Sequence, residues 1–311
     1  MTEKDSESSA KAATLVPSGK LSDEGYARVL GFQIYWRSFG AKDTSSRKTV
    51  LCLHGGPGLT HDYLLALKDL TKFGYRVVFY DQLGCGKSEL PKNRALFTIE
   101  RAVEEVEAVR KELDLGKVHL LGSSYGGLLA IAYALQYQRN LRSLISVSGL
   151  DDVMKAVSEM ERMKARLPAS TLETLTKYEE EGDYDNPEYQ NALMVFYNRH
   201  FCRLKVWPQE LTYSLEHVSK PVYSTMNGPT EFAIIGNIRY WNVSRELNKI
   251  TVPTLVTCGK YDEVSPKVAR SIHTGIKHSK LVMFSNSSHM AMWEESEKFT
   301  RVLNDFLASV K

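Results

Sequence analysis

The sequence has few cysteines, no long apolar run and no marked excess of either charge. Only four of its 311 residues are cysteines, and none forms a CxxC pair, so a zinc site or a dense disulfide framework is not expected. The net charge of +3 is small, and no run of Lys and Arg predicts a nucleic-acid partner. No apolar stretch approaches the ~20 residues of a membrane-spanning helix, so no membrane partner is expected either.

The N-terminal residues 1–20 are polar and rich in Ser and Ala. They lack the apolar segment of a secretory signal peptide, and we expect them to form a disordered leader. Cys52 and Cys258 lie inside apolar runs, where a reduced thiol acts as a small hydrophobic group. These features predict a cytoplasmic protein in a reducing compartment.

The first half of the chain alternates short apolar runs with segments of helical spacing. A strand, a turn at Gly31 and a second strand are predicted over Tyr26 to Tyr35. Further strands are predicted at Thr49–Leu53, Tyr75–Tyr80, Lys117–Leu121 and Leu141–Ser148, with helices over 62–73, 99–113 and 127–138. Strands that are apolar on both faces and separated by helices predict a mostly parallel sheet flanked by helices.

The pattern changes after Gly149. Residues 151–248 are rich in Glu, Lys, Met and Tyr at helical spacing and contain hardly any strand candidate. Strands then return at Thr254–Cys258 and Lys280–Phe284, with helices predicted over 266–277 and 294–310. The sequence therefore predicts one α/β core, made of residues 21–150 and 249–311, with a helical cap (151–248) inserted after the sixth strand.

The strongest motif is Gly122-Ser123-Ser124-Tyr125-Gly126, which matches G-x-S-x-G between a predicted strand and a predicted helix. This context is typical of the nucleophile turn of the α/β-hydrolase fold, where the serine hydroxyl projects from the end of the sheet. The alternative is a Gly/Ser-rich loop without chemistry, which the strand and helix around it make less favourable. The motif predicts that Ser124 is a nucleophile.

A second glycine-rich turn, His54-Gly55-Gly56-Pro57-Gly58, also follows a predicted strand. The oxyanion formed in acyl transfer needs two hydrogen-bond donors. In this fold they are the N–H of the residue after the nucleophile, here Tyr125, and an N–H of the early loop. We therefore expect Gly56 and Tyr125 to form an oxyanion hole, although a turn of this composition can also be purely structural.

A serine needs a base, and in this fold the acid and base follow it in the order Ser, Asp, His. Asp262 lies just past the strand Thr254–Cys258, and His289 lies just past Lys280–Phe284. Both should therefore reach the sheet edge where Ser124 sits, with His289 as general base and Asp262 orienting it. Asp152 and Glu263 are the rival acids.

Other candidate motifs carry no chemistry. Gly84 to Ser88 resembles the end of a phosphate-binding loop, but the glycine required five positions before Gly86 is Asp81. No H-E-x-x-H or comparable ligand set occurs, so neither a metal nor a cofactor is expected. His61 and His119 are assigned no catalytic role.

Taken together, these segments resemble the proline iminopeptidases, α/β-hydrolase aminopeptidases of the S33 type, with particular likeness to the tricorn-interacting aminopeptidase of archaea. The likeness runs from about Tyr26 to the C-terminus. It includes the segments 54–58, 81–88, 122–127 and 259–262, the one ending at His289, and three more: His61-Asp62-Tyr63-Leu64-Leu65, Asn186-Pro187-Glu188-Tyr189-Gln190 and Met226-Asn227-Gly228-Pro229-Thr230-Glu231-Phe232.

The resemblance implies release of an N-terminal residue, often proline, from short peptides that carry a free N-terminus. It assigns recognition of the α-amino group to Glu231 and Glu263, which would otherwise be read as solvated surface acids. Tyr125 stands where many bacterial members carry Trp, which favours a broader preference for small or apolar first residues. The resemblance also implies a link to an upstream protease that supplies peptides.

Two alternatives stay open from the sequence. One is an amino-acid amidase or small-ester hydrolase with the same three catalytic residues. The other is a non-catalytic binding protein that keeps the fold, which an intact Ser-Asp-His set disfavours.

Overall fold

The computed structural model describes residues 21–41 and 48–310, so the predicted leader 1–20 lies outside the described residues. Eight strands form one sheet in the order β1-β2-β4-β3-β5-β6-β7-β8. They are β1 (Leu21–Val29), β2 (Phe32–Phe39), β3 (Thr49–Leu53), β4 (Arg76–Tyr80), β5 (Val118–Ser123), β6 (Leu141–Val147), β7 (Thr254–Gly259) and β8 (Ser279–Phe284). β2 is antiparallel to β1 and β4, and all the other pairs are parallel. The predicted α/β-hydrolase fold is confirmed.

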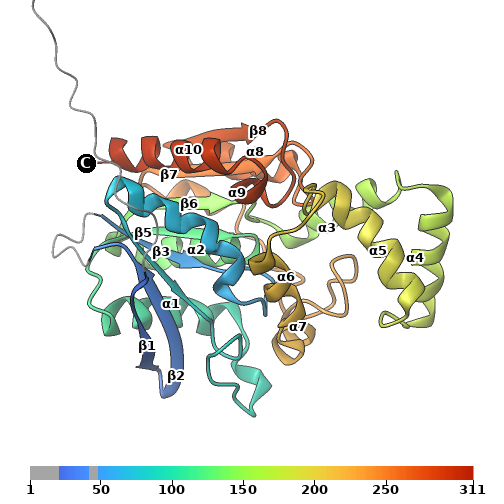
Figure 1. Cartoon of the computed structure of the whole chain (residues 1–311), viewed down its shortest axis with the longest axis horizontal. Helices are drawn as coiled ribbons and strands as arrows, with labels where there is room; N and C mark the ends of the chain where they lie inside the picture. Colours follow the sequence, from blue (N-terminus) through green and yellow to red (C-terminus); the bar gives the residue numbers. More distant parts are fainter. Residues whose placement is uncertain (1–20, 42–47, 311) are drawn as a thin grey trace, which may run out of the picture.

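The central strands are buried on both faces because neighbouring residues enter two separate cores. Leu51 and Leu53 of β3 belong to one apolar cluster, whereas Val50 and Cys52 belong to the other. The first cluster packs against α1 (Ile99–Glu112), α2 (Tyr125–Tyr137) and α8 (Pro266–Gly275). The second packs against the 3-10 helix η2 (His61–Phe73), α9 (Ala291–Glu294) and α10 (Ser296–Ser309). Figure 1 shows these two helical layers on either side of the sheet.

The strand register brings distant segments to one edge. Leu53 at the end of β3 pairs with Gly122 of β5, and Ser123 pairs with Val147 at the end of β6. Since these strands are parallel, the loops that follow them leave the sheet on the same side. The segments after β3, β5, β6 and β7 therefore converge there, as the sequence predicts.

Five helices lie between β6 and β7: α3 (Val153–Lys164), α4 (Ala169–Glu181), α5 (Pro187–His200), α6 (Gln209–Glu216) and α7 (Lys220–Met226). The described residues also form short 3-10 helices: η3 (Arg94–Leu96), η4 (Gln138–Asn140) and η5 (Leu247–Lys249). Figure 1 shows α4 and α5 projecting beyond the body of the sheet. In the described ranges, none of the helices combines the length and apolarity needed to span a membrane.

The helix predicted over 294–310 is present as α10, which covers 296–309. A short helix, α9, precedes it, and the two are separated at Glu295, whose φ of −128° and ψ of 48° are not helical. The Glu295 carboxylate accepts hydrogen bonds from the Asn286 N–H at 3.0 Å and the Ser287 hydroxyl at 2.6 Å. This carboxylate thus ties the break to the loop that carries His289.

Candidate active site

Ser124 occupies a sharp turn between β5 and α2. Its φ of 58° and ψ of −124° lie in a region that non-glycine residues rarely adopt. A Cβ on Gly122 would overlap the carbonyl oxygen of Gly126, and a Cβ on Gly126 would overlap that of Leu53. The glycines therefore allow three backbone segments to approach closely, and the turn leaves Ser124 half-buried at the sheet edge.

Asp262 and His289 meet at the same edge. His289 Nδ1 lies 2.7 Å from Oδ1 of Asp262. The Asp262 carboxylate also accepts hydrogen bonds from the Val264 N–H at 2.9 Å and the Ser148 hydroxyl at 2.5 Å. Because both of its oxygens accept hydrogen bonds, this buried carboxylate fixes the orientation of the imidazole. The Phe201 ring stacks on the imidazole with 5.6 Å between the ring centroids.

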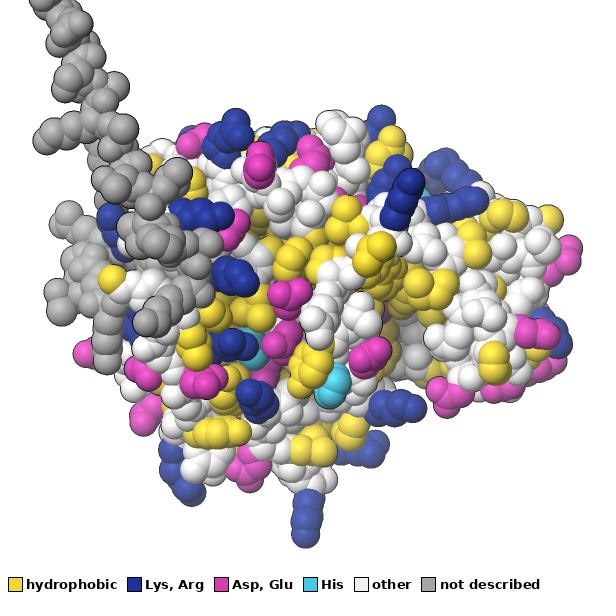
Figure 2. Space-filling model, in the orientation of Figure 1, with side chains coloured by type: hydrophobic (Ala, Val, Ile, Leu, Met, Phe, Trp, Pro, Cys, Tyr) yellow, Lys and Arg dark blue, Asp and Glu magenta, His cyan; other side chains and the backbone are white. Residues whose placement is uncertain are grey.

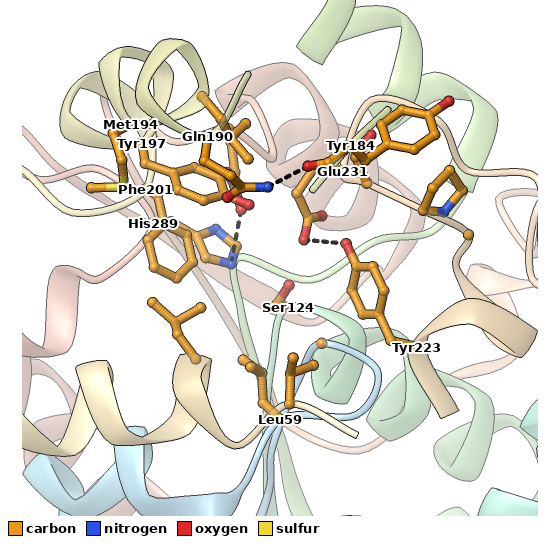
Figure 3. Close-up of a pocket in the computed structure, with 18 of the residues that line it drawn as sticks. Leu59, Ser124, Tyr184, Gln190, Met194, Tyr197, Phe201, Tyr223, Glu231 and His289 are labelled. Atoms are coloured by element: carbon orange, nitrogen blue, oxygen red, sulfur yellow. Dashed lines mark hydrogen bonds and ion pairs between the residues drawn. The ribbon is translucent and has the colours of Figure 1, made fainter. Parts of the chain in front are cut away.

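A cavity of about 570 Å³ joins Ser124 and His289 with the carboxylates of Glu231 and Glu263. Figure 3 shows the Ser124 hydroxyl and the His289 ring facing this space. In the described part of the chain the two side chains are not hydrogen-bonded to each other; Nε2 of His289 lies 3.7 Å from a Glu263 oxygen. Apolar side chains line much of the cavity, and on the face drawn in Figure 2 hydrophobic side chains gather over the junction of α5 and α6.

Two backbone N–H groups beside Ser124 are available as donors. Neither Gly56 N–H nor Tyr125 N–H donates a hydrogen bond to another described residue. Tyr63 fixes the loop that contains Gly56: its buried hydroxyl accepts from the Gly55 N–H at 2.7 Å and lies 3.5 Å from the carbonyl oxygen of Ser123. The early loop is thus attached directly to the strand that leads to Ser124.

Glu263 and Glu231 place two carboxyl groups next to Ser124. Glu263 is buried, and its Oε2 has no hydrogen-bond partner among the described residues. Burial raises the pKa of Glu263 to about 8; the charge of His289 opposes this rise and that of Glu231 adds to it. Burial also raises the pKa of Glu231, while the hydrogen bond from the Tyr223 hydroxyl at 2.8 Å acts against the rise. Figure 3 shows this hydrogen bond at the cavity wall.

The carboxylates also act on His289. Burial alone would lower the pKa of His289, but the charges of Asp262 and Glu263 outweigh burial and raise it to about 9. A cation bound at Glu263 would therefore also change the pKa of His289.

Several known proteins with similar sequences are named proline iminopeptidase. A family model described as alpha/beta hydrolase fold matches residues 48–296. A proline iminopeptidase of Saccharolobus solfataricus is 49% identical over 290 residues, which cover 93% of this chain and 93% of that protein. One of Thermoplasma volcanium is 46% identical over 287 residues, which cover 92% of this chain and 96% of that protein.

The chain belongs to the proline iminopeptidase family. The resemblance drawn from the sequence is confirmed. Among solved structures, the crystal structure of VinJ has a TM-score of 0.91 at 36% identity and covers 94% of this chain and 100% of its own. The proline iminopeptidase of Mycobacterium smegmatis has a TM-score of 0.86 at 30% identity, covering 92% and 98%. An enol-lactonase from Burkholderia xenovorans LB400, at 21% identity, shares the fold alone.

Of the two rival acids, Glu263 lines the cavity but Asp152 lies elsewhere, as do His61 and His119. Asp152 caps α3, accepting from the Lys155 N–H at 3.1 Å, and also accepts from the Asn242 amide at 2.7 Å. It does not line the cavity. His61 pairs with buried Asp81 at 2.7 Å, and His119 lies 2.8 Å from the Ser143 hydroxyl. No group of three or more potential metal ligands occurs among residues 21–41 and 48–310.

Three features of the site carry no sequence signal by themselves. The His200 carbonyl oxygen accepts from both the Glu263 N–H and the His289 N–H at 3.1 Å, so the end of α5 positions the two loops. Tyr63 is hydrogen-bonded to the Gly55 N–H of the early loop, and Tyr223 is hydrogen-bonded to Glu231. A small apolar cavity of about 30 Å³ also opens beside Ser124, Glu231 and Glu263, walled by Leu128, Leu150, Val153, Met160, Ile234 and Ile238.

Proposed function

We propose that the protein is a serine aminopeptidase that releases an N-terminal proline, or another small apolar residue, from short peptides through an acyl-enzyme. The observation that carries this proposal is the pair of carboxyl groups beside Ser124, those of half-buried Glu231 and buried Glu263, with one Glu263 oxygen unpaired. A buried carboxylate without a partner is costly, and an ammonium group is the partner that its charge favours. The relatives named proline iminopeptidase support the same reaction.

In the proposed acylation, the substrate ammonium binds Glu231 and Glu263 and brings the first carbonyl carbon to Ser124. The Ser124 hydroxyl attacks this carbon while Nε2 of His289 takes its proton. The N–H groups of Gly56 and Tyr125 stabilise the oxyanion. Catalytic hydrogen bonds commonly tighten when substrate binds, so the Ser124–His289 contact is expected to form in the complex.

Collapse of the tetrahedral intermediate breaks the C–N bond, and His289 gives its proton to the leaving amine of the shortened peptide. Water then attacks the acyl-enzyme with His289 again as base. This step releases the free amino acid and restores the Ser124 hydroxyl.

The two cavities suggest where each part of the substrate binds. The apolar side chains around the small cavity suit contact with a proline ring or another small apolar side chain, and the larger cavity suits the rest of the peptide. We also propose that residues 151–248 act as a cap over a core made of 21–150 and 249–311.

The four described cysteines are buried free thiols, which supports our proposal of a cytoplasmic location. Supply of peptides by an upstream protease remains part of the proposal.

The test compares prolyl and alanyl arylamides with their N-acetylated forms. An aminopeptidase should cleave the free amines and leave the acetylated compounds nearly intact. An amidase or esterase with the same catalytic residues would accept both, and a protein that failed to react with an organophosphonate at Ser124 would not be a serine hydrolase.

A further inference from the structure

The larger cavity has one cationic side chain apart from His289. Lys220 is the only lysine or arginine among the described residues that line it, whereas Asp185, Glu231 and Glu263 are all acidic. Glu231 and Glu263 lie beside Ser124, while Lys220 and Asp185 are highly exposed, at 84% and 95% of their side-chain surfaces. Two carboxyl groups therefore lie at the inner end of the cavity, and an exposed pair of Lys220 and Asp185 lies at its mouth.

Helix α7 fixes where this lysine lies. The Ser219 N–H donates to the Gly58 carbonyl oxygen at 2.8 Å, so the start of α7 is attached to the loop that contains Gly56. Lys220, Tyr223 and Ser224 all line the cavity, and their spacing of three and four residues places them on one face of the helix. Lys220 thus stands one turn from Tyr223, which bonds Glu231.

The lysine is weakly engaged within the chain. Its Nζ lies 3.9 Å from Asp185 on the loop between α4 and α5, and both groups are exposed to solvent. Exposed pairs of this kind contribute little to stability, so a substrate group can replace Asp185 at little cost.

We propose that Lys220 recognises the C-terminal carboxylate of di- and tripeptides, a specificity that rests on the proposed aminopeptidase function. Each extended residue spans about 3.3–3.6 Å, so the carboxylate of a short peptide held by its amine lies only a few ångströms beyond the cleaved bond. The inner carboxylates repel this group and Lys220 attracts it. The cavity therefore aligns a zwitterionic peptide, and amidated or longer peptides lose the outer contact.

The experiment measures kcat/KM for Pro-Ala and for Pro-Ala-amide and takes their ratio within each enzyme, so that a general loss of activity cancels. K220M should lower the acid-to-amide ratio about threefold, and K220E more, because one exposed ion pair is removed or reversed. K220R should keep the ratio and D185N should raise it. K249M is the matched control: Lys249 is an exposed lysine that pairs with Glu246 and does not line the cavity.

Rising salt should reduce the wild-type ratio towards that of K220M. A ratio that is the same in wild type, K220M and K220E would overturn the proposal for Lys220 while leaving the aminopeptidase function intact. If wild type cleaves neither peptide, the proposed function itself is contradicted.

Discussion

A carboxylate oxygen of Glu263 lies 3.7 Å from Nε2 of His289, the ring nitrogen opposite the one that bonds Asp262. Because Glu263 follows Asp262 directly in the chain, one short loop places a negative charge on each side of the imidazole. Together these charges raise the pKa of His289 to about 9 despite burial. We expect a substrate ammonium bound to Glu263 to offset its charge, lower the pKa of His289 and so free the base when substrate is present.

The pH dependence of Ser124 reactivity tests this link. A base must be neutral to take the serine proton, so a raised pKa moves the loss of reactivity to higher pH. E263Q removes one charge that raises the pKa of His289, and its acidic limb should therefore lie at lower pH than that of wild type. The measurement is the rate of inactivation by a neutral organophosphonate across pH, which does not depend on amine binding. An unchanged limb, or one at higher pH, would show that Glu263 does not act on the base.

Tyr63 should act through the position of the early loop. Y63F leaves the buried Gly55 N–H without its acceptor, which costs about 1–3 kcal/mol. We expect a lower urea midpoint and a kcat reduced about tenfold, with less change in KM, because the neighbouring residue is Gly56, the proposed oxyanion donor. Y26F is the control, since Tyr26 is 57% exposed. Equal kcat values for Y63F and wild type would exclude the positioning role.

The glycines of the turn that carries Ser124 should tolerate no side chain. G122A places a methyl group against the backbone of Gly126, and overpacking typically costs about 1–3 kcal/mol or more where backbone must move. We expect a lower Tm and loss of phosphonate labelling at Ser124. In G25A the nearest atom to the new Cβ is 4.0 Å away, on the Trp36 ring, so both properties should stay at wild-type values. A fully labelled, equally stable G122A would contradict the described turn.

The sheet and the order of the candidate catalytic residues could be predicted because both follow from local patterns. Strands such as Thr49–Leu53 are apolar on both faces, and parallel strands deliver Ser124, Asp262 and His289 to one edge. Glu231 and Glu263 could be selected only through the family resemblance, because nothing in their local sequence distinguishes a buried acid from a solvated one.

The remaining features depend on contacts between distant segments. The Tyr63 hydroxyl accepts a hydrogen bond from the Gly55 N–H, but in the sequence Tyr63 looks like any other core aromatic residue. His200 contributes only its backbone carbonyl. The short helix α9 was not predicted, and the Glu295 carboxylate that follows it is hydrogen-bonded to the loop before His289. None of these has a periodicity or motif that a single sequence reveals.

The most direct test of the account is the discrimination between prolyl arylamide and its N-acetylated form in wild type and in E231Q/E263Q. Two charge-assisted contacts of about 1.5–3 kcal/mol each predict that wild type prefers the free amine by at least ~100-fold in kcat/KM. The double variant should lose most of this preference while Ser124 still reacts with the phosphonate. Equal wild-type rates on free and acetylated substrates, or an undiminished preference in the double variant, would contradict recognition of the amine by Glu231 and Glu263.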